Sequence, residues 1–235
     1  MTQVESLRMT RVMRVEDPEA IAVAVEALRQ GRLVAFPTDT VYGVGASALL
    51  PSAVEQLFVA KQRPRSMAIP LLLASATDAL LVAEDVPKLA SLLMRRFWPG
   101  GLTLVLFRSA SVPDVVTAGG KTVAVRLPDH AVPRALAAGL GAPLAATSAN
   151  LSGHKSPVTA QDVLNDLDGR IDVLLDGGPC PGGVESTILD LTGLELAFLR
   201  EGAISRQQIE DFRQGLIGVT HTANLPRSGQ ASRRL

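Results

Sequence analysis

Apolar residues recur at two different spacings along this chain, and the spacing changes from segment to segment. Between residues 21 and 28 they repeat at helical intervals. Asp17-Pro18-Glu19 in front of them is typical of an N-cap followed by an acidic first turn, and Gly31 is typical of a helix end. The short apolar run Leu33–Phe36, which Pro37 ends, predicts a buried strand.

The same patterns predict further helices and strands along the rest of the chain. Strands are expected at Ile69–Leu73, Leu102–Phe107, Val123–Leu127, Pro143–Ala146, Ile171–Leu175, Thr187–Leu191 and Leu196–Leu199, the last two as a pair. Helices are expected at Ser52–Lys61 with Ser52 and Glu55 as a capping box, at Val86–Phe97, at Val132–Leu140, after a cap near Thr159, and after a cap at Ser205.

Helices mixed with strands, without an internal repeat, predict an α/β fold with a largely buried, mixed sheet and flanking helices. No proline- or serine-rich linker divides the chain before its end. We therefore expect a single domain over residues 12–215. The polar, irregular residues 216–235 predict a flexible C-terminal tail.

Composition excludes several classes of protein. The 235 residues carry 23 basic and 23 acidic side chains, so no overall field attracts nucleic acid or an anionic membrane. Cys180 is the one cysteine and the three histidines lie far apart, which argues against a disulfide framework or a protein-held metal site. No signal peptide and no apolar stretch of roughly 20 residues is present, so we expect a cytoplasmic protein without a membrane partner.

Polar and glycine-rich segments follow several of the predicted strands, where α/β proteins place their ligands. Pro37–Gly45 offers threonine hydroxyls, an aspartate and an exposed backbone. Lys61 and Arg63 form a cationic pair beyond a helix, with Pro64 favouring an extended Arg63, and such a pair suits a polyphosphate. Each of these segments taken alone is equally compatible with an ordinary loop or a solvated helix end.

Three further segments complete the set. Arg126 alternates with apolar residues in a buried strand, so it is expected to meet a carboxylate of a ligand or of the protein. Ser148 and Asn150 follow a strand and suit phosphate or nucleotide binding, although such residues also build turns. The glycines of 177–183, which combine with Glu185-Ser186-Thr187 in one segment, are typical of a backbone that wraps a ligand or of a mobile lid.

One apparent motif is rejected. Gly43–Ala48 matches a dinucleotide-binding fingerprint, but it does not directly follow a strand and Pro51 soon comes after it.

The motifs PTDTVYGVG, KQRP, WPGGLTLVL, VAVRLP, SANLSG, ESTILDL and LREGAI, in this order, resemble the YrdC/Sua5 family. The resemblance covers about Pro18 to Ile204. It implies a YrdC-like fold, a twisted α/β sheet around a concave, positively lined cavity. It also implies an L-threonylcarbamoyladenylate synthase, a nucleotidyltransferase. Such an enzyme forms threonylcarbamoyl-AMP and pyrophosphate from L-threonine, bicarbonate and ATP, for N6-threonylcarbamoyladenosine at tRNA position 37.

The resemblance also implies site residues. The family's catalytic tetrad falls on Lys61, Arg63, Ser148 and Asn150, which would bind the ATP phosphates and the adenylate. The further ATP contacts would be Thr122, Ser156 and Arg200, and the threonine contacts Thr40, Arg126 and Ser186. Mg²⁺ is expected with ATP, held mainly by phosphate oxygens and water. tRNA and a threonylcarbamoyl transferase are possible partners.

Two departures from the family pattern stand out. Many members carry a histidine shortly after the Pro-Leu strand, whereas Pro70–Ala74 has none, so one expected threonine contact is missing. The longer Sua5 branch adds a second domain, and on its length the chain resembles the short YrdC-type branch instead.

Other functions remain open at this point. The alternatives are a relative that acts on another carbamoyl donor, as in hydrogenase maturation, and a relative without this activity. A third is an RNA-binding or ribosome-maturation factor of the same fold that uses the basic cavity.

Overall fold

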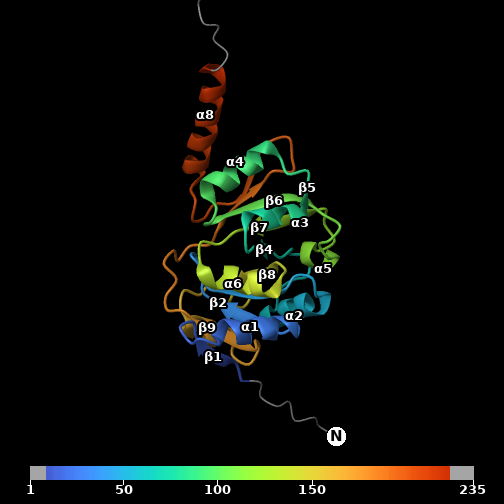
Figure 1. Ribbon diagram of the computed structural model, residues 1–235, viewed down its shortest axis with the longest axis vertical. Helices are drawn as coiled ribbons and strands as arrows, with labels where there is room; N and C mark the ends of the chain where they lie inside the picture. Colours follow the sequence, from blue (N-terminus) through green and yellow to red (C-terminus); the bar gives the residue numbers. More distant parts are fainter. Residues whose placement is uncertain (1–8, 223–235) are drawn as a thin grey trace, which may run out of the picture.

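The computed structural model describes residues 9–222 of the chain (Figure 1). Its strands are β1 (Arg11–Arg14), β2 (Val34–Phe36), β3 (Gly43–Ser47), β4 (Leu71–Leu72), β5 (Ala83–Glu84), β6 (Leu102–Arg108), β7 (Thr122–Arg126), β8 (Leu144–Ser148), β9 (Val173–Asp176), β10 (Thr187–Asp190) and β11 (Ala197–Arg200). Its helices are α1 (Ala20–Arg29), α2 (Pro51–Lys61), η1 (Ala76–Asp78), α3 (Ala79–Val82), α4 (Lys88–Phe97), α5 (Asp114–Thr117), α6 (Ala131–Leu140), α7 (Ala160–Leu167) and α8 (Arg206–Thr222).

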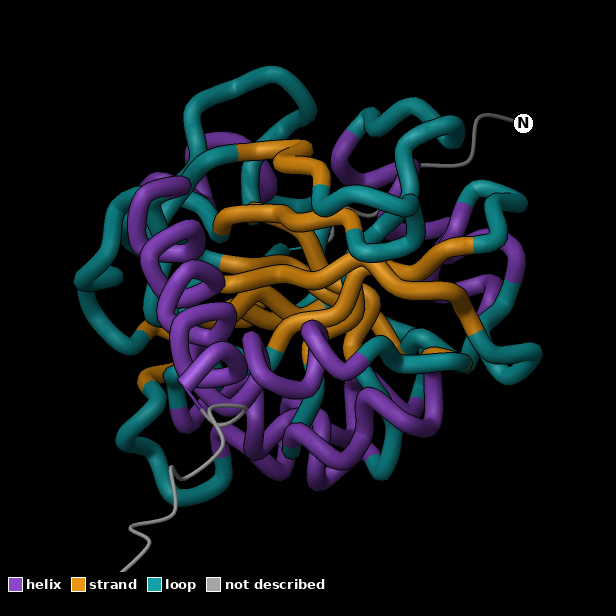
Figure 2. The backbone as a smooth tube through the Cα atoms, turned by 90° about the horizontal axis from the view of Figure 1, so that it is seen from above, coloured by secondary structure: helices purple, strands orange, loops and turns teal. Residues whose placement is uncertain are grey.

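The strands form one sheet in the order β1-β9-β2-β3-β8-β4-β7-β6-β10-β11, with β5 paired to β6. Parallel and antiparallel neighbours are mixed: β4 runs parallel to β7 and antiparallel to β8. In Figure 2 the strands pass through the middle of the molecule and most helices lie along one side. The predicted α/β fold with a mixed, buried sheet and flanking helices is therefore confirmed.

Helices α1 and α6 pack closely against each other on the sheet, α1 against β9, β2 and β3 and α6 against β4. A Cβ added at Gly139 of α6 would lie 2.8 Å from Val25 Cγ2 of α1, so only glycine permits this approach. The Arg29 guanidinium also donates to Gly139 O at 2.6 Å. This contact belongs to a hydrophobic cluster separate from the larger core beneath α2, α4 and α7.

Two of the predicted helix caps are correct. Thr159 and Asp162 form a reciprocal capping box at the start of α7, with bonds of 3.1 and 2.9 Å. Ser205 and Gln208 exchange the same kind of bonds before α8, at 2.9 and 3.2 Å. Each pair satisfies backbone N–H groups that the first helical turn leaves without partners.

Two other predicted caps are wrong. α1 begins at Ala20 rather than after Asp17, and Asp17 instead closes a turn by accepting from Arg14 N at 3.1 Å. α2 begins at Pro51, with Leu50 in the cap position, so Ser52 lies within the helix and makes no capping box. Proline at the first helical position has no N–H that needs a partner, which explains the earlier start.

Strand β3 occupies a segment that the sequence pattern did not predict as a strand. It pairs antiparallel with β2 and β8 in the centre of the sheet. A Cβ at Gly43 would lie 2.9 Å from Phe36 Cε2, so the glycine makes room for the aromatic ring. A strand at this place also agrees with the rejection of Gly43–Ala48 as a nucleotide-binding turn.

Helix α8 begins beside α4 and projects from the body of the molecule (Figure 1). Phe212 packs edge-on against Phe97 of α4, with ring centroids 5.7 Å apart. The tail expected from residue 216 is helical as far as Thr222, and its remaining residues lie outside the described part of the chain. Within residues 9–222, no helix has the length and apolar character that crossing a membrane requires.

Candidate functional site

A cavity of about 630 Å³ opens on the sheet and is lined by residues of β6, β7, β8 and β10 and of the loops beside them. Every site residue expected from the sequence lies in this wall: Thr40, Lys61, Arg63, Thr122, Arg126, Ser148, Asn150, Ser156, Ser186 and Arg200. Another hollow of about 720 Å³ lies between α1 and β1 and includes none of them. We place the site in the first cavity because it gathers cations and hydroxyls from widely separated segments.

Backbone hydrogen bonds hold the loops of this cavity together. Tyr42 N donates to Pro157 O at 2.9 Å, and Ala149 N donates to Tyr42 O at 2.9 Å. Ser152 N donates to Lys61 O, also at 2.9 Å. The threonine-rich loop after β2, the loop after β8 and the end of α2 therefore form one connected framework.

Lys61 is the last residue of α2, and its side chain is 1% exposed. Its Nζ donates to the carbonyl oxygens of Ser148 and Asn150. Burial, together with the positive charge of Arg63, lowers the pKa of Lys61 to about 7. An anion bound beside this amine would favour its charged form, so the site is built to respond to a negatively charged ligand.

Arg63 follows the end of α2 and bonds to its own loop. Its Nε donates to Met67 O at 3.2 Å and its Nη2 to Ala68 O at 2.9 Å. Burial lowers the pKa of Arg63 from its usual value. The predicted projection of Lys61 and Arg63 toward one side is confirmed, since both line the cavity.

Asn150 lines the cavity and contains a buried acceptor. Its Nδ2 donates to Leu151 O at 3.0 Å and to His154 O at 2.7 Å, which fixes the orientation of the amide. Its Oδ1 is buried without a hydrogen-bond partner. A buried acceptor of this kind is costly in protein interiors, so this oxygen marks a place for a donor from a ligand or water.

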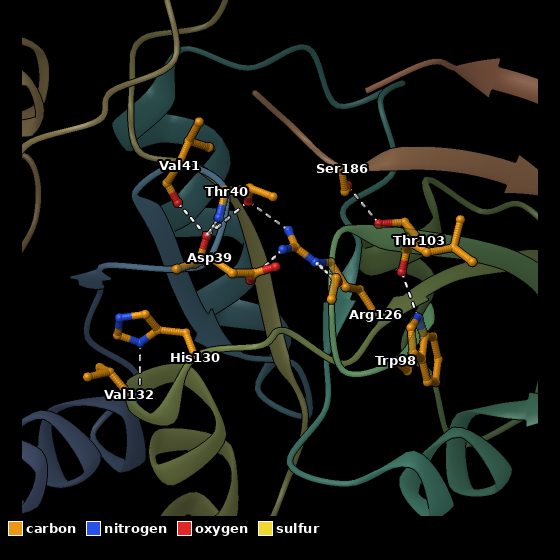
Figure 3. A network of polar contacts seen from close by, with 12 residues as sticks. Asp39, Thr40, Val41, Trp98, Thr103, Arg126, His130, Val132 and Ser186 are labelled. Atoms are coloured by element: carbon orange, nitrogen blue, oxygen red, sulfur yellow. Dashed lines mark hydrogen bonds and ion pairs between the residues drawn. The ribbon is translucent and has the colours of Figure 1, made fainter. Parts of the chain in front are cut away.

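Arg126, at the end of β7, meets a carboxylate of the protein (Figure 3). Its Nη2 pairs with Asp39 Oδ1 at 2.6 Å, its Nη1 donates to Thr40 Oγ1 at 3.0 Å, and its Nε donates to Gly100 O at 2.9 Å. Burial lowers the pKa of Arg126, and Asp39 opposes that change. The sequence left open whether a ligand or the protein supplies the carboxylate, and the structure identifies Asp39.

Arg200, at the end of β11, forms a second network with Glu185. Its Nη1 pairs with Glu185 Oε2, and its Nε donates to Ser186 O at 2.9 Å. Ser156 Oγ donates to Glu185 Oε1 at 2.7 Å. Ser186 Oγ also lies 2.8 Å from Thr103 Oγ1 on β6.

Sequence reasoning did not select Asp39 and Glu185 as site residues. Both nevertheless stand inside motifs that carry the family resemblance, PTDTVYGVG and ESTILDL. Each pairs with an arginine that was selected, and the partners are distant in sequence. A charged residue inside such a motif was the available signal.

The glycine-rich segment 177–183 packs against the loop that contains Asp39, Thr40 and Tyr42. Tyr42 OH donates to Gly178 O and Gly183 N donates to Thr40 O, both at 2.8 Å. A Cβ at Gly182 would lie 2.6 Å from Asp39 O. These contacts favour a fixed support for Asp39 and Thr40 over the expected mobile lid.

The segment Pro70–Ala74 contributes Pro70 and Leu72 to the cavity wall, and no histidine. His130 lies near Asp39 in Figure 3, but its Nδ1 accepts from Val132 N at 3.2 Å and so caps α6. Among residues 9–222, no group of three or more histidine, cysteine or acidic side chains is arranged to bind a metal.

Comparison with known proteins gives a consistent result. The family model Sua5_yciO_yrdC, described as "Telomere recombination", matches residues 26–202. Threonylcarbamoyl-AMP synthase of Pyrococcus abyssi is 45% identical over 81% of this chain and 56% of its own length. The Bacillus subtilis enzyme of the same name is 44% identical over 91% of this chain and 60% of its own. The chain thus spans a little more than half the length of these relatives.

A solved structure of P. abyssi Sua5 complexed with L-threonine superimposes with a TM-score of 0.82 at 43% identity, covering 87% of this chain and 60% of that one.

Proposed function

Because this chain belongs to the Sua5/YciO/YrdC family, we propose that it condenses L-threonine, bicarbonate and ATP into threonylcarbamoyl-AMP. The observation that carries the proposal is the cavity itself, which joins the buried Lys61 to Arg63, Arg200 and Arg126 in one wall. The names of the P. abyssi and B. subtilis relatives support it.

The proposed reaction needs no protein nucleophile. The threonine amine takes up the carbon of bicarbonate as a carbamate, with loss of water. A carbamate oxygen then forms a bond to the α-phosphorus of ATP, and the bond to the β-phosphate breaks, releasing pyrophosphate. The protein contributes by orienting the reactants and by stabilising the charge that develops on the phosphates.

Lys61 and Arg63 would bind the ATP phosphates, together with Ser148 and Asn150. A hydrogen bond to a charged group contributes about 1.5–3 kcal/mol, so both cations are important for the transition state. The pKa of Lys61 is about 7 in the empty cavity. Phosphate bound beside the amine would raise this pKa, so that Lys61 carries a full positive charge. Thr122, Ser156 and Arg200 supply further nucleotide contacts.

At the other end of the cavity, Arg126 would hold the threonine carboxylate. Its guanidinium is held in place by Asp39 and Gly100 O, so little rotational freedom is lost when a carboxylate binds. Thr40, which accepts from Arg126, and Ser186, which accepts from Arg200, also line the cavity and would offer hydroxyls to the amino acid. The missing histidine leaves this end more apolar than the family pattern implies.

Mg²⁺ enters this proposal as part of the substrate, bound to the triphosphate. The product would serve N6-threonylcarbamoyladenosine formation on tRNA through a transferase, in the cytoplasm. Threonine and ATP follow from the relatives' names, whereas tRNA and the transferase rest on the family resemblance.

The test is pyrophosphate release from ATP, with threonine and bicarbonate supplied separately and together. Release should require both, and Lys61→Ala and Arg63→Ala should each lower it at least about tenfold, as expected from the loss of one charge-assisted hydrogen bond. Lys88→Ala is the matched control, because Lys88 is exposed on α4 and outside the cavity wall. Near-normal release by both site variants would overturn the assignment of the phosphate site.

A further inference from the structure

Glu185 occupies an unusual position in the cavity wall. It immediately precedes β10, and its side chain is surrounded by groups that the proposed function reserves for the nucleotide. Its carboxylate Oε1 accepts from Ser156 Oγ at 2.7 Å, and its Oε2 pairs with Arg200 Nη1. Both expected nucleotide contacts are therefore bound to a protein anion when the cavity is empty.

The backbone of Glu185 is fixed by the loop that follows β11. Ala203 N donates to Glu185 O at 2.8 Å. A Cβ at Gly202 would lie 2.2 Å from that same oxygen, so the loop packs tightly against it. Thr187 Oγ1 accepts from Gly202 N and Ile204 N at 2.9 and 3.1 Å. The carboxylate can leave its partners only by rotation of the side chain.

The side chain has room for that rotation. The Glu185 side chain is 31% exposed and that of Arg200 is 38% exposed. An ion pair with this much solvent contact contributes little to stability and exchanges partners readily. Carboxylate and phosphate also bind a guanidinium with similar geometry, so one can replace the other on Arg200.

The electrostatic influence of Glu185 extends beyond these contacts. Its negative charge favours the charged forms of both Lys61 and Arg63 and so raises their pKa values, against the effect of burial. In the empty cavity Glu185 thus offsets part of the positive charge that a polyphosphate would otherwise meet. Removing it should leave the site more attractive to anions.

We propose that Glu185 is an internal competitor of the nucleotide, which occupies Ser156 and Arg200 in the empty cavity and releases them to phosphate. The inference rests on the proposed function, because it takes the nucleotide to bind there. Competition of this kind weakens nucleotide binding. It also provides Ser156 and Arg200 with a carboxylate partner as soon as the nucleotide leaves, which favours release of the nucleotide.

Asp190 provides a matched control. It lines the same cavity and carries the same charge, but its Oδ1 accepts from Thr192 N at 2.9 Å and from Thr192 Oγ1 at 2.6 Å. Asp190→Asn therefore removes a negative charge from the wall without freeing Arg200 or Ser156. A general charge effect and a specific competition can be separated in this way.

The experiment is calorimetric titration of wild type, Glu185→Gln and Asp190→Asn with MgATP in the absence of threonine. Glu185→Gln should bind about tenfold more tightly than wild type, which corresponds to about 1.4 kcal/mol. Asp190→Asn should stay within about threefold of wild type, because Ser156 and Arg200 pair with Glu185 and the Asp190 carboxylate accepts from Thr192. Thermal unfolding of each variant shows whether it is folded, and Glu185→Ala serves as a second test if the glutamine variant is not.

The direction of the change separates the outcomes. A carboxylate that merely orients Arg200 or binds the magnesium of ATP would make binding weaker when it is replaced. Unchanged or weaker binding by Glu185→Gln, or equal tightening by Asp190→Asn, overturns the role of Glu185 and leaves the proposed function standing. Absence of MgATP binding by every protein, wild type included, overturns both.

Discussion

The two ends of the cavity each contain an arginine paired with a carboxylate, but the two pairs differ in exposure. The side chains of Arg126 and Asp39 are 7% and 15% exposed, whereas those of Arg200 and Glu185 are 38% and 31% exposed. Arg126 also has neutral oxygen partners from two different loops. The buried pair is suited to hold one arginine in a fixed orientation, and the exposed pair is suited to exchange.

Lys61 differs from both arginines in its hydrogen-bond partners. It is almost fully buried, yet its hydrogen-bond partners are the carbonyl oxygens of Ser148 and Asn150 rather than a carboxylate. Burial and the positive charge of Arg63 lower its pKa to about 7. Arginine stays charged because its intrinsic pKa is high, whereas the charge of Lys61 depends on what the cavity contains.

The largest effect should come from breaking the buried pair. Asp39→Ala leaves Arg126 buried without its carboxylate, and removing one partner of such a pair typically costs about 3–5 kcal/mol. We expect the free energy of unfolding, from urea denaturation, to fall by that amount. A loss below about 1 kcal/mol would mean that the pair behaves like one at the surface.

A smaller effect should follow from keeping the charge at the buried end and changing its shape. Arg126→Lys retains a cation but loses the planar fork that can bind a carboxylate with two hydrogen bonds. The KM for threonine should rise about tenfold to a hundredfold, equivalent to one hydrogen bond to a charged group. The KM for ATP, measured in the same assay, should change little. Equal changes in both would contradict a threonine-specific role.

The pH dependence of stability should distinguish Lys61 from both arginines. The pKa of Lys61 is about 7 in the folded protein and near its usual 10.5 when unfolded. Between these values the unfolded chain binds more protons, so the free energy of unfolding rises with pH. Relative to Lys61→Met, wild type should gain up to about 1.4 kcal/mol for each pH unit above 7. Parallel pH profiles of the two proteins would contradict the lowered pKa.

The smallest effect should come from breaking the exposed pair. Glu185→Ala should change the free energy of unfolding by less than about 1 kcal/mol, because solvent screens a half-exposed ion pair. The same urea denaturation used for Asp39→Ala makes the comparison direct. If the loss matched that of Asp39→Ala, the contrast between the two ends would fail.

The sequence predicted the site residues better than it predicted the contacts between them. Lys61, Arg63 and Asn150 were predicted as site residues because they stand at fixed positions in short motifs. The structure brings them into one cavity wall. The pairing of Arg126 with Asp39 was not visible, since it joins residues on two loops far apart in the chain. In the sequence, Arg126 indicated only that a carboxylate should lie near it, without identifying which one.

Elements of the fold show the same limit. The run Leu102–Phe107 was predicted as a strand because its apolar, β-branched residues match a buried sheet, and β6 is found there. β3 was missed because Gly43, Gly45 and their small neighbours have low strand propensity, and only packing against Phe36 explains them. Local sequence patterns identify elements whose own residues favour the observed structure. They fail where packing against residues distant in the sequence determines the structure.

Detection of the product tests most directly the proposal that one cavity joins threonine, bicarbonate and ATP. The protein is incubated with MgATP, threonine and isotope-labelled bicarbonate, and the quenched mixture is analysed by mass spectrometry. We expect a threonylcarbamoyl-AMP species that carries the bicarbonate label and that is lost with Lys61→Ala. ATP turnover without a labelled adenylate, or no turnover by the wild type, would contradict it.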